Sequence, residues 1–419
     1  MRTKRFLAAF LALCLSLTLL PSGVIAVESE AEAELPAPEY PQLEAAQSDL
    51  EDREESVEAI LDVVESPAPA MPMGETLTYG DLYYTVSGNT ITITGCADGV
   101  TSLTIPAQID GKSVTAIGNN AFNGKSSLTN LTIPEGVTSL GYYMIRGTAI
   151  SSITIPSTVT SSPSNGNYNG ALAGCSTLNT VVFAQGTTAI PDHICASNSQ
   201  NSYITSIVIP DTVKTVGSSA FYKCTRLSGE IDIPEGMQTI GSSAFAYCSS
   251  ITNLDIPKTV KTVGASAFYG CTALTKVTTH YNSTVEWTGS INDSAFAGCT
   301  SLTDVELAGS YKKLGNYLFD GCNSLTNLTI PEGVTSLGYY MIRGTAISSI
   351  TIPSTVTSSP SNGNYNGALA GCSTLNTVVF AQGTTKIPDY ICASKSQNSY
   401  IQSVYIPPNR TTSWQLCFL

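Results

Sequence analysis

The sequence predicts a β-rich solenoid, with short parallel strands on one face and turns or short helical segments on the other. Two observations predict it. One apolar pattern recurs with spacings of 22 to 28 residues from about residue 100 to the end of the chain. The composition is 42% hydrophobic but only 12% charged, and soluble domains typically carry roughly 25% charged residues. Thr, Ser, Asn and Gly fill the polar positions instead, which suits strands joined by turns.

Each repeated unit combines a short strand with a segment that returns the chain. The unit is clearest in residues 251–271, which read ITNLDIPKTVKTVGASAFYGC. Alternation of Leu254 and Ile256 with polar residues places the apolar side chains on one face of a strand, and Pro257 ends it because proline has no N–H to donate. A lone unit cannot bury these side chains, so stacked units must share one core. About thirteen units fit, and their period is that of leucine-rich repeats.

The chain divides into three parts. Residues 1–26 are expected to be a secretory signal peptide, because basic residues precede a short apolar run and small residues lead to cleavage after Ala26. Residues 27–76 are expected to be an acidic, Pro-rich disordered linker, which accounts for the formal net charge of −13. Residues 77–419 form the predicted leucine-rich-repeat solenoid. No later stretch is apolar for long enough to span a membrane, so we expect a secreted protein, free or associated with the cell surface.

A long segment of the solenoid occurs twice. Residues 128–210 recur as residues 325–407, and only six positions differ between the two copies. The duplication provides either two equivalent binding surfaces or simply a longer rod produced by expansion of the gene. The sequence leaves both interpretations open.

The residue types that catalysis and metal binding need are scarce. Histidine occurs only at His193 and His280, and the second copy carries Tyr390 in place of His193. The chain therefore has too few histidines to form most nucleophile–base triads or histidine-based metal sites. Phosphate-binding glycine loops and basic patches with interleaved aromatic residues are also missing. We predict no enzyme activity, no catalytic or metal-binding residues, no cofactor and no nucleic-acid partner.

Seven cysteines share one position of the repeat: Cys175, Cys224, Cys248, Cys271, Cys299, Cys322 and Cys372. Equivalent positions stack, so we predict a column of small buried residues with free thiols. Parallel side chains in such a column point in the wrong relative direction for easy disulfide formation, and the Cys-x-x-Cys spacing of zinc sites is absent. If any cysteines are oxidised, the expected partners lie outside the column: Cys96, Cys195, Cys392 and Cys417.

Outward-facing strand positions offer a candidate binding surface on the predicted concave side of the central units. Its residues are Glu230, Asp232, Asn253, Asp255, Lys276, Asp304 and Glu306. Adjacent units would hold Asp232 and Asp255 about 5 Å apart, which is unfavourable unless a cation or a basic ligand lies there. We hypothesise a site for a basic protein surface or a calcium ion. The alternative is an ordinary solvated polar face.

A longer loop, residues 161–170, provides a second candidate. It contains Tyr168, and the second copy repeats it with Tyr365. Loops on a rigid scaffold often carry recognition, and tyrosine provides contact area at little entropic cost. Simple variation in loop length is the alternative explanation.

The repeats resemble the BspA-like leucine-rich repeat family of bacterial surface and secreted proteins. The match is clearest over residues 206–224, 231–248 and 254–271, which share the Ile-Pro, Ile/Val-Gly, Ala-Phe and Cys positions. Residues 83–111 resemble the usual start of the family, so we expect a hairpin-like cap over the first unit. The resemblance spans residues 77–407. It implies adhesion, or binding of host proteins and matrix, by some relatives, with no catalytic role for the repeats.

These inferences predict an extracellular protein that binds host or neighbouring-cell macromolecules without covalent chemistry. A glycan-binding or carbohydrate-processing accessory role and a passive spacer are the alternatives, so the expected partners are extracellular proteins or glycans. No wall-sorting motif follows the repeats, and residues 408–419 break the pattern, either as an improvised cap or as a truncation. The ligand, the oligomeric state and attachment to the cell wall stay open.

Overall fold

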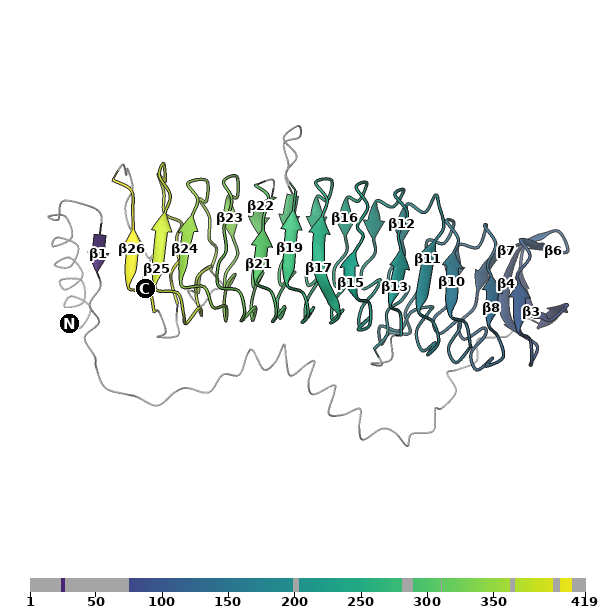
Figure 1. Cartoon of the computed structure of the whole chain (residues 1–419). Helices are drawn as coiled ribbons and strands as arrows, with labels where there is room; N and C mark the ends of the chain where they lie inside the picture. Colours follow the sequence, from purple (N-terminus) through teal and green to yellow (C-terminus); the bar gives the residue numbers. More distant parts are fainter. Residues whose placement is uncertain are drawn as a thin grey trace, which may run out of the picture. The chain divides into compact units, whose positions relative to one another are not determined.

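Two ladders of short parallel strands run through the repeat region, and most units contribute one strand to each (Figure 1). The computed structural model describes residues 24–26, 75–198, 203–280, 289–309, 311–361, 366–394 and 400–408. Almost all of the predicted linker, Tyr365 and Cys417 lie outside the described residues. Within these ranges, no helix is long and apolar enough to cross a bilayer.

The first ladder contains the strands that the Leu-x-Ile alternation predicts. Its strands are β5 (Ser102–Thr104), β8 (Asn130–Thr132), β10 (Ser152–Ile155), β11 (Thr180–Phe183), β13 (Ser206–Val208), β15 (Gly229–Ile231), β17 (Ile251–Ile256), β19 (Lys276–Thr279), β21 (Asp304–Glu306), β24 (Ser349–Ile352), β25 (Thr377–Phe380) and β26 (Ser403–Tyr405). Paired strands along it are parallel, except that β1 (Val24–Ala26) pairs antiparallel with β26. The ladder is divided into four sheets.

The second ladder is formed by the segments that return the chain. Its strands are β12 (Ala189–Ile190), β14 (Thr215–Val216), β16 (Thr239–Ile240), β18 (Thr262–Val263), β20 (Gly289–Ile291), β22 (Tyr311–Leu314) and β23 (Ser336–Leu337). All of these pairs are parallel and in sequence order. Where a unit of the duplicated segment lacks a second strand, a single bridge continues the ladder, as between Ser139 and Ser161.

An N-terminal cap closes the start of the second ladder, as the sequence predicts. It consists of β2 (Leu77–Tyr79), β3 (Leu82–Ser87) and β4 (Thr90–Cys96), which pair antiparallel in that order. Strand β4 then pairs in parallel with β7 (Lys112–Ile117), which pairs with β6 (Gln108–Ile109) and with β9 (Ser139–Leu140). The cap therefore converts an open edge into a paired one.

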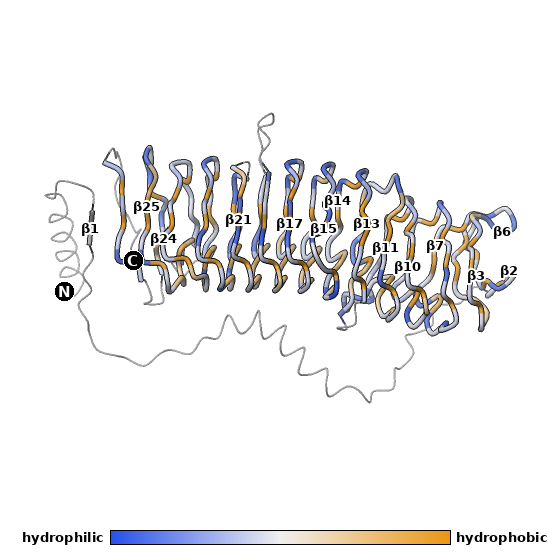
Figure 2. The backbone as a smooth tube through the Cα atoms, viewed as in Figure 1, coloured by the Kyte–Doolittle hydropathy of each residue, from blue (hydrophilic) through white to orange (hydrophobic). Residues whose placement is uncertain are grey.

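The core lies between the two ladders and continues from unit to unit. In β17, Leu254 and Ile256 are buried while Asp255 between them is exposed. Side chains at the Ala-Phe position stack along the core: the ring of Phe268 lies 5.3 Å from that of Phe245 and 5.6 Å from that of Phe296, with nearly parallel planes. Figure 2 shows hydrophobic residues recurring at the same places in successive units. Each ring is thus buried by its neighbours in other units, as the sequence predicts.

A glycine follows five of the seven second-ladder strands, β14, β16, β18, β22 and β23, and allows consecutive units to approach closely. A Cβ atom on Gly264 would lie 2.5 Å from the carbonyl carbon of Gly241 and from the backbone nitrogen of Ser242. No side chain fits there unless the two backbones separate. This steric requirement explains the Ile/Val-Gly part of the repeat.

The returning segments are turns, and the expected short helical segments are absent from the described residues. Their backbone explains the difference. Ser266 has a φ of 55° and Gly270 a φ of 68°, and residues with positive φ interrupt a right-handed helix. Equivalent residues such as Ser219 and Ser243 have the same conformation. Each unit therefore reverses direction through tight turns instead of a helix.

Replacing Phe268 by alanine tests the shared core. Because Phe268 is fully buried and contacts rings of both neighbouring units, Phe268→Ala should lower the free energy of unfolding by about 3–5 kcal/mol. Urea unfolding followed by circular dichroism measures the change. Lys258→Ala, at an exposed position, is the control and should change it by less than about 0.5 kcal/mol. Equal effects of the two variants would contradict a core shared between units.

Candidate functional site

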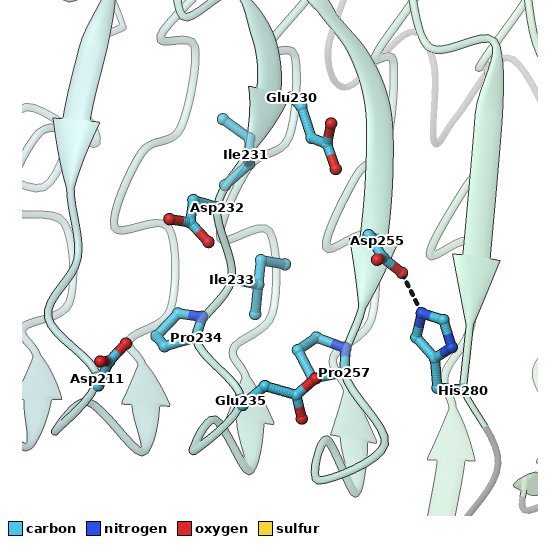
Figure 3. Close-up of a pocket in the computed structure, with 10 residues that line it drawn as sticks. All are labelled: Asp211, Glu230, Ile231, Asp232, Ile233, Pro234, Glu235, Asp255, Pro257 and His280. Atoms are coloured by element: carbon cyan, nitrogen blue, oxygen red, sulfur yellow. Dashed lines mark hydrogen bonds and ion pairs between the residues drawn. The ribbon is translucent and has the colours of Figure 1, made fainter.

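Three of the predicted carboxylates, Glu230, Asp232 and Asp255, line a hollow of about 410 Å³ on the exposed side of the first ladder (Figure 3). Two prolines, Pro234 and Pro257, line it together with the charged residues, and so do Ile231 and Ile233, whose side chains are buried in the core. Its charged and titratable residues are Asp211, Glu230, Asp232, Glu235, Asp255 and His280. The hollow therefore combines an apolar base with a negatively charged rim.

Strand register places the predicted site residues in two columns. Glu230 pairs with Asn253, Asn253 with Lys276, and Lys276 with Asp304. In the second column, Asp255 pairs with Thr278 and Thr278 with Glu306. Ile231 pairs with Leu254. The next residues along the two strands, Asp232 and Asp255, therefore lie side by side in adjacent units. The alternation that buries the core thus directs all of these side chains to one face.

At one end of these columns a single lysine pairs with two carboxylates. The ammonium nitrogen of Lys276 lies 3.1 Å from a carboxylate oxygen of Asp304 and 2.8 Å from one of Glu306. Hydrogen bonds to Glu306 and Asp304 raise the pKa of Lys276 above its ordinary value. The three side chains are well exposed. They form a local ion-pair network and lie outside the hollow.

At the hollow itself, one carboxylate has a partner that we did not predict. The Nε2 atom of His280 lies 2.6 Å from Oδ1 of Asp255 (Figure 3), and both side chains are about half exposed. His280 occupies the position that Pro257 occupies in the preceding unit. The proline that usually ends the strand is thus replaced by a residue able to hydrogen-bond across units.

The remaining four carboxylates of the hollow have no basic partner among the described residues. They are Asp211, Glu230, Asp232 and Glu235, all exposed. The described part of the chain contains no group of three or more His, Cys, Asp or Glu side chains arranged to hold a metal ion. A calcium site needs several oxygens that converge on one point, and a basic side chain does not.

Sequence reasoning missed Asp211, Glu235 and His280. Asp211 and Glu235 each follow the proline that ends a first-ladder strand, and His280 replaces that proline. Aligning the residue at and after this proline across units would have found all three. The strand alternation on which we relied says nothing about positions beyond the strand.

Tyr168 belongs to a different surface. Tyr168 is 46% exposed. Its ring stacks on that of Tyr222, with the two centroids 5.2 Å apart. The ring of His193 lies 5.9 Å from that of Tyr168, with the two planes tilted by 59°. Tyr222 continues edge-on to Tyr247. The loop thus anchors Tyr168 on a row of aromatic residues from successive units. Its counterpart Tyr365 lies outside the described residues.

Every cysteine in the described solenoid is buried, and none of these cysteines is part of a disulfide. In the column, the thiol of Cys271 donates to the carbonyl oxygen of Phe245 at 3.3 Å, and that of Cys248 to Phe221 at 3.2 Å. Cys195, outside the column, has a free buried thiol as well. Burial raises the pKa of the Cys195, Cys248 and Cys271 thiols, that of Cys271 to about 12, so the reactive thiolate form of these three residues is suppressed.

The raised thiol pKa predicts a loss of stability at alkaline pH. An unfolded thiol loses its proton near pH ~8.5, whereas folded Cys271 keeps it to about pH 12. The free energy of unfolding should therefore fall as pH rises above ~8.5, by about 2 kcal/mol near pH ~10 for this group. Urea midpoints in reducing buffer across this range measure the slope. Cys271→Ala should make the slope shallower by the share of this one thiol, because Cys195, Cys248, Cys299 and Cys322 also have raised pKa values. An unchanged slope would show that the Cys271 thiol makes no contribution.

Comparisons with known proteins identify the repeat. The model of the "BspA type Leucine rich repeat region" matches residues 95–202, 194–286 and 289–419, which together are more than half of the chain. No curated protein matches the chain significantly.

Solved structures of bacterial leucine-rich repeat proteins also resemble the chain. One from Bacteroides ovatus is 20% identical, with a TM-score of 0.46, and the match covers 74% of this chain and 99% of that one. The pneumococcal vaccine antigen PcpA is 15% identical, with a TM-score of 0.39, covering 77% and 93%. A leucine-rich cell surface protein from Faecalibacterium prausnitzii is 19% identical, with a TM-score of 0.29, covering 75% and 96%.

Proposed function

Because the chain belongs to the BspA-type leucine-rich repeat family, we propose that it is a secreted or cell-surface binding protein without enzymatic activity. Its partners are extracellular proteins of the host or of neighbouring cells. The acidic hollow binds a Lys- or Arg-rich segment of such a partner, as an adhesion contact. The observation that carries this proposal is the set of carboxylates around the hollow that no basic side chain of the described residues neutralises.

Both the charge and the apolar base of the hollow support a basic peptide segment as the ligand. Carboxylates held side by side repel each other, and a bound cation relieves that repulsion. A lysine or arginine also carries an apolar stem, which fits against the prolines of the hollow, Pro234 and Pro257. A rim of this kind also attracts basic partners over a distance at low ionic strength.

Neutralising the rim should weaken binding of a basic peptide. The double variant Glu230→Gln/Asp232→Asn keeps side-chain shape but removes two charges. We expect it to bind a fluorescent lysine-rich peptide about tenfold more weakly than the wild type, a change of ~1.4 kcal/mol, and with a smaller dependence on salt. Fluorescence anisotropy at low and high ionic strength measures both effects.

Asp81→Asn, an exposed carboxylate in the cap, is the matched control and should leave the affinity unchanged. Equal affinity of the double variant and the wild type would contradict the proposed site. Binding to a glycan array without binding to the basic peptide would favour the glycan alternative instead.

Export is tested through the N-terminus. If residues 1–26 are a signal peptide, protein recovered outside the cytoplasm should begin at Val27, as N-terminal sequencing would show. Ala26→Phe replaces the small residue needed before the cleavage site and should leave the precursor uncut. Cleavage would also remove β1 from the edge of β26. Intact Met1 on protein recovered outside the cytoplasm would contradict the predicted cleavage.

A further inference from the structure

One unit of the first ladder carries an extra residue, and it is the unit that forms most of the acidic hollow. In every other unit of this ladder, three positions separate the first inward apolar residue from the next, as from Ile251 to Leu254. From Leu227 to Ile231 the separation is four. Gly229 lies within this longer segment with a φ of 85°, a conformation that glycine adopts without strain. A Cβ atom on it would meet no atom within 4 Å, so the space beside the extra residue is open.

The first ladder is interrupted beside this extra residue. Strand β13 pairs with β11 and β15 pairs with β17, but β13 and β15 do not pair with each other. In the preceding unit, the carbonyl oxygen of Asn179 accepts hydrogen bonds from the backbone N–H groups of Thr205 and Ser206. The carbonyl oxygen of Thr205, at the equivalent position, accepts no such bond from the described residues. We call this break between β13 and β15 the seam.

The seam exposes an apolar side chain that the repeat normally buries. Ile207 occupies the inward position of β13 and packs against the core, but it is partly exposed. The inward residues of the adjacent units, Val181 and Ile231, are buried. Strands β8 and β10 are also unpaired, yet their inward residues, Leu131 and Ile153, stay buried. A break in pairing alone therefore does not expose the core, and the extra residue distinguishes the seam from that break.

The seam continues into the acidic hollow. Asp211, which lines the hollow on one side, follows β13, whereas Glu230 and Asp232 belong to the unit of β15 (Figure 3). Val208 occupies the same repeat position as Asp232, one unit earlier, and is 49% exposed. An apolar strip formed by Ile207 and Val208 thus borders the carboxylates of the hollow.

We propose that the ligand of the hollow is an extended segment of a partner protein in which a large apolar residue accompanies the Lys or Arg residues. The apolar side chain packs over the seam against Ile207 and Val208. This inference rests on the basic ligand proposed above and adds to its specificity, because charge alone does not distinguish one basic segment from another.

The geometry of an extended segment fits both contacts. Alternate side chains of such a segment point to the same side, about 7 Å apart. An apolar side chain two positions from a lysine therefore reaches the seam while the lysine reaches Asp232, which lies one unit from Val208. Covering Ile207 and Val208 removes apolar surface from water, and this stabilises the complex in addition to the ion pairs.

Two fluorescently labelled peptides, KAKALA and KAKAAA, separate the apolar contact from the charge of the rim. They have the same charge and differ only in the leucine. We expect the full chain to bind the leucine peptide about fivefold more tightly in fluorescence anisotropy. Val208→Thr keeps the branched shape but adds a hydroxyl group. It should remove most of this preference and leave the affinity for the alanine peptide unchanged. Val379→Thr, at an outward valine of β25, is the matched control and should keep the preference.

Deleting Ser228 tests the role of the extra residue. The deletion restores the separation found in the other units, so β15 should pair with β13 and cover Ile207. We expect the preference for the leucine peptide to disappear. The alanine peptide should still bind in a salt-dependent manner, because the carboxylates of the rim remain. Circular dichroism verifies that the variant is folded, and the result for Val208→Thr does not depend on it.

The outcomes separate this inference from the function on which it rests. Absence of binding of both peptides to the wild type would overturn the basic ligand, and the apolar contact with it. Equal binding of the two peptides to the wild type would overturn the apolar contact alone. A fivefold preference that persists in Val208→Thr, or in the folded deletion variant, would do the same.

Discussion

Burial of apolar side chains between units is the constraint on which the rest of this structure depends. Leu254, Ile256 and Phe268 all belong to one unit, yet they are covered by residues of the units before and after it. Backbone hydrogen bonds between the parallel strands fix the register of that packing. Glycine at positions such as Gly264 then permits the close approach that leaves no gap between units.

This packing converts positions in the repeat into columns on the surface. Because outward side chains do not contribute to the core, they vary from unit to unit while the scaffold stays the same. The first ladder therefore carries an acidic hollow at Glu230 and Asp232, and an ion-paired cluster around Lys276 two units further on. Recognition by such a protein is set by which unit carries which outward residue.

The duplicated segment shows how the preceding unit affects the surroundings of a side chain when the local sequence is the same. Arg146 and Arg343 have identical flanking residues and the same backbone, yet one is exposed and the other is enclosed by Tyr317 and Asp320. A solenoid unit presents its side chains next to those of the preceding unit. Two copies of one segment are consequently equivalent in their interior and different at their boundaries.

The cap was expected from the resemblance of residues 83–111 to the start of the family. The alternation and period of the sequence determined the first ladder, the buried apolar residues and the column of buried thiols, because these features follow from which side chains avoid water. They did not reveal the second ladder, whose strands, such as Thr262–Val263, are too short to show an alternation. Nor did they exclude helical segments, since the left-handed conformation of Ser266 leaves no mark on the hydrophobic pattern.

For the candidate site, the sequence placed Glu230, Asp232 and Asp255 on one face, because alternation fixes the direction of each side chain. Only the tertiary structure decided their partners: His280 for Asp255, and Lys276 for the carboxylates beyond the hollow. The periodicity of a segment determines which of its side chains face the core and which face solvent. Pairing depends on register, on side-chain length and on what the adjacent unit carries, and these are properties of the stacked units together.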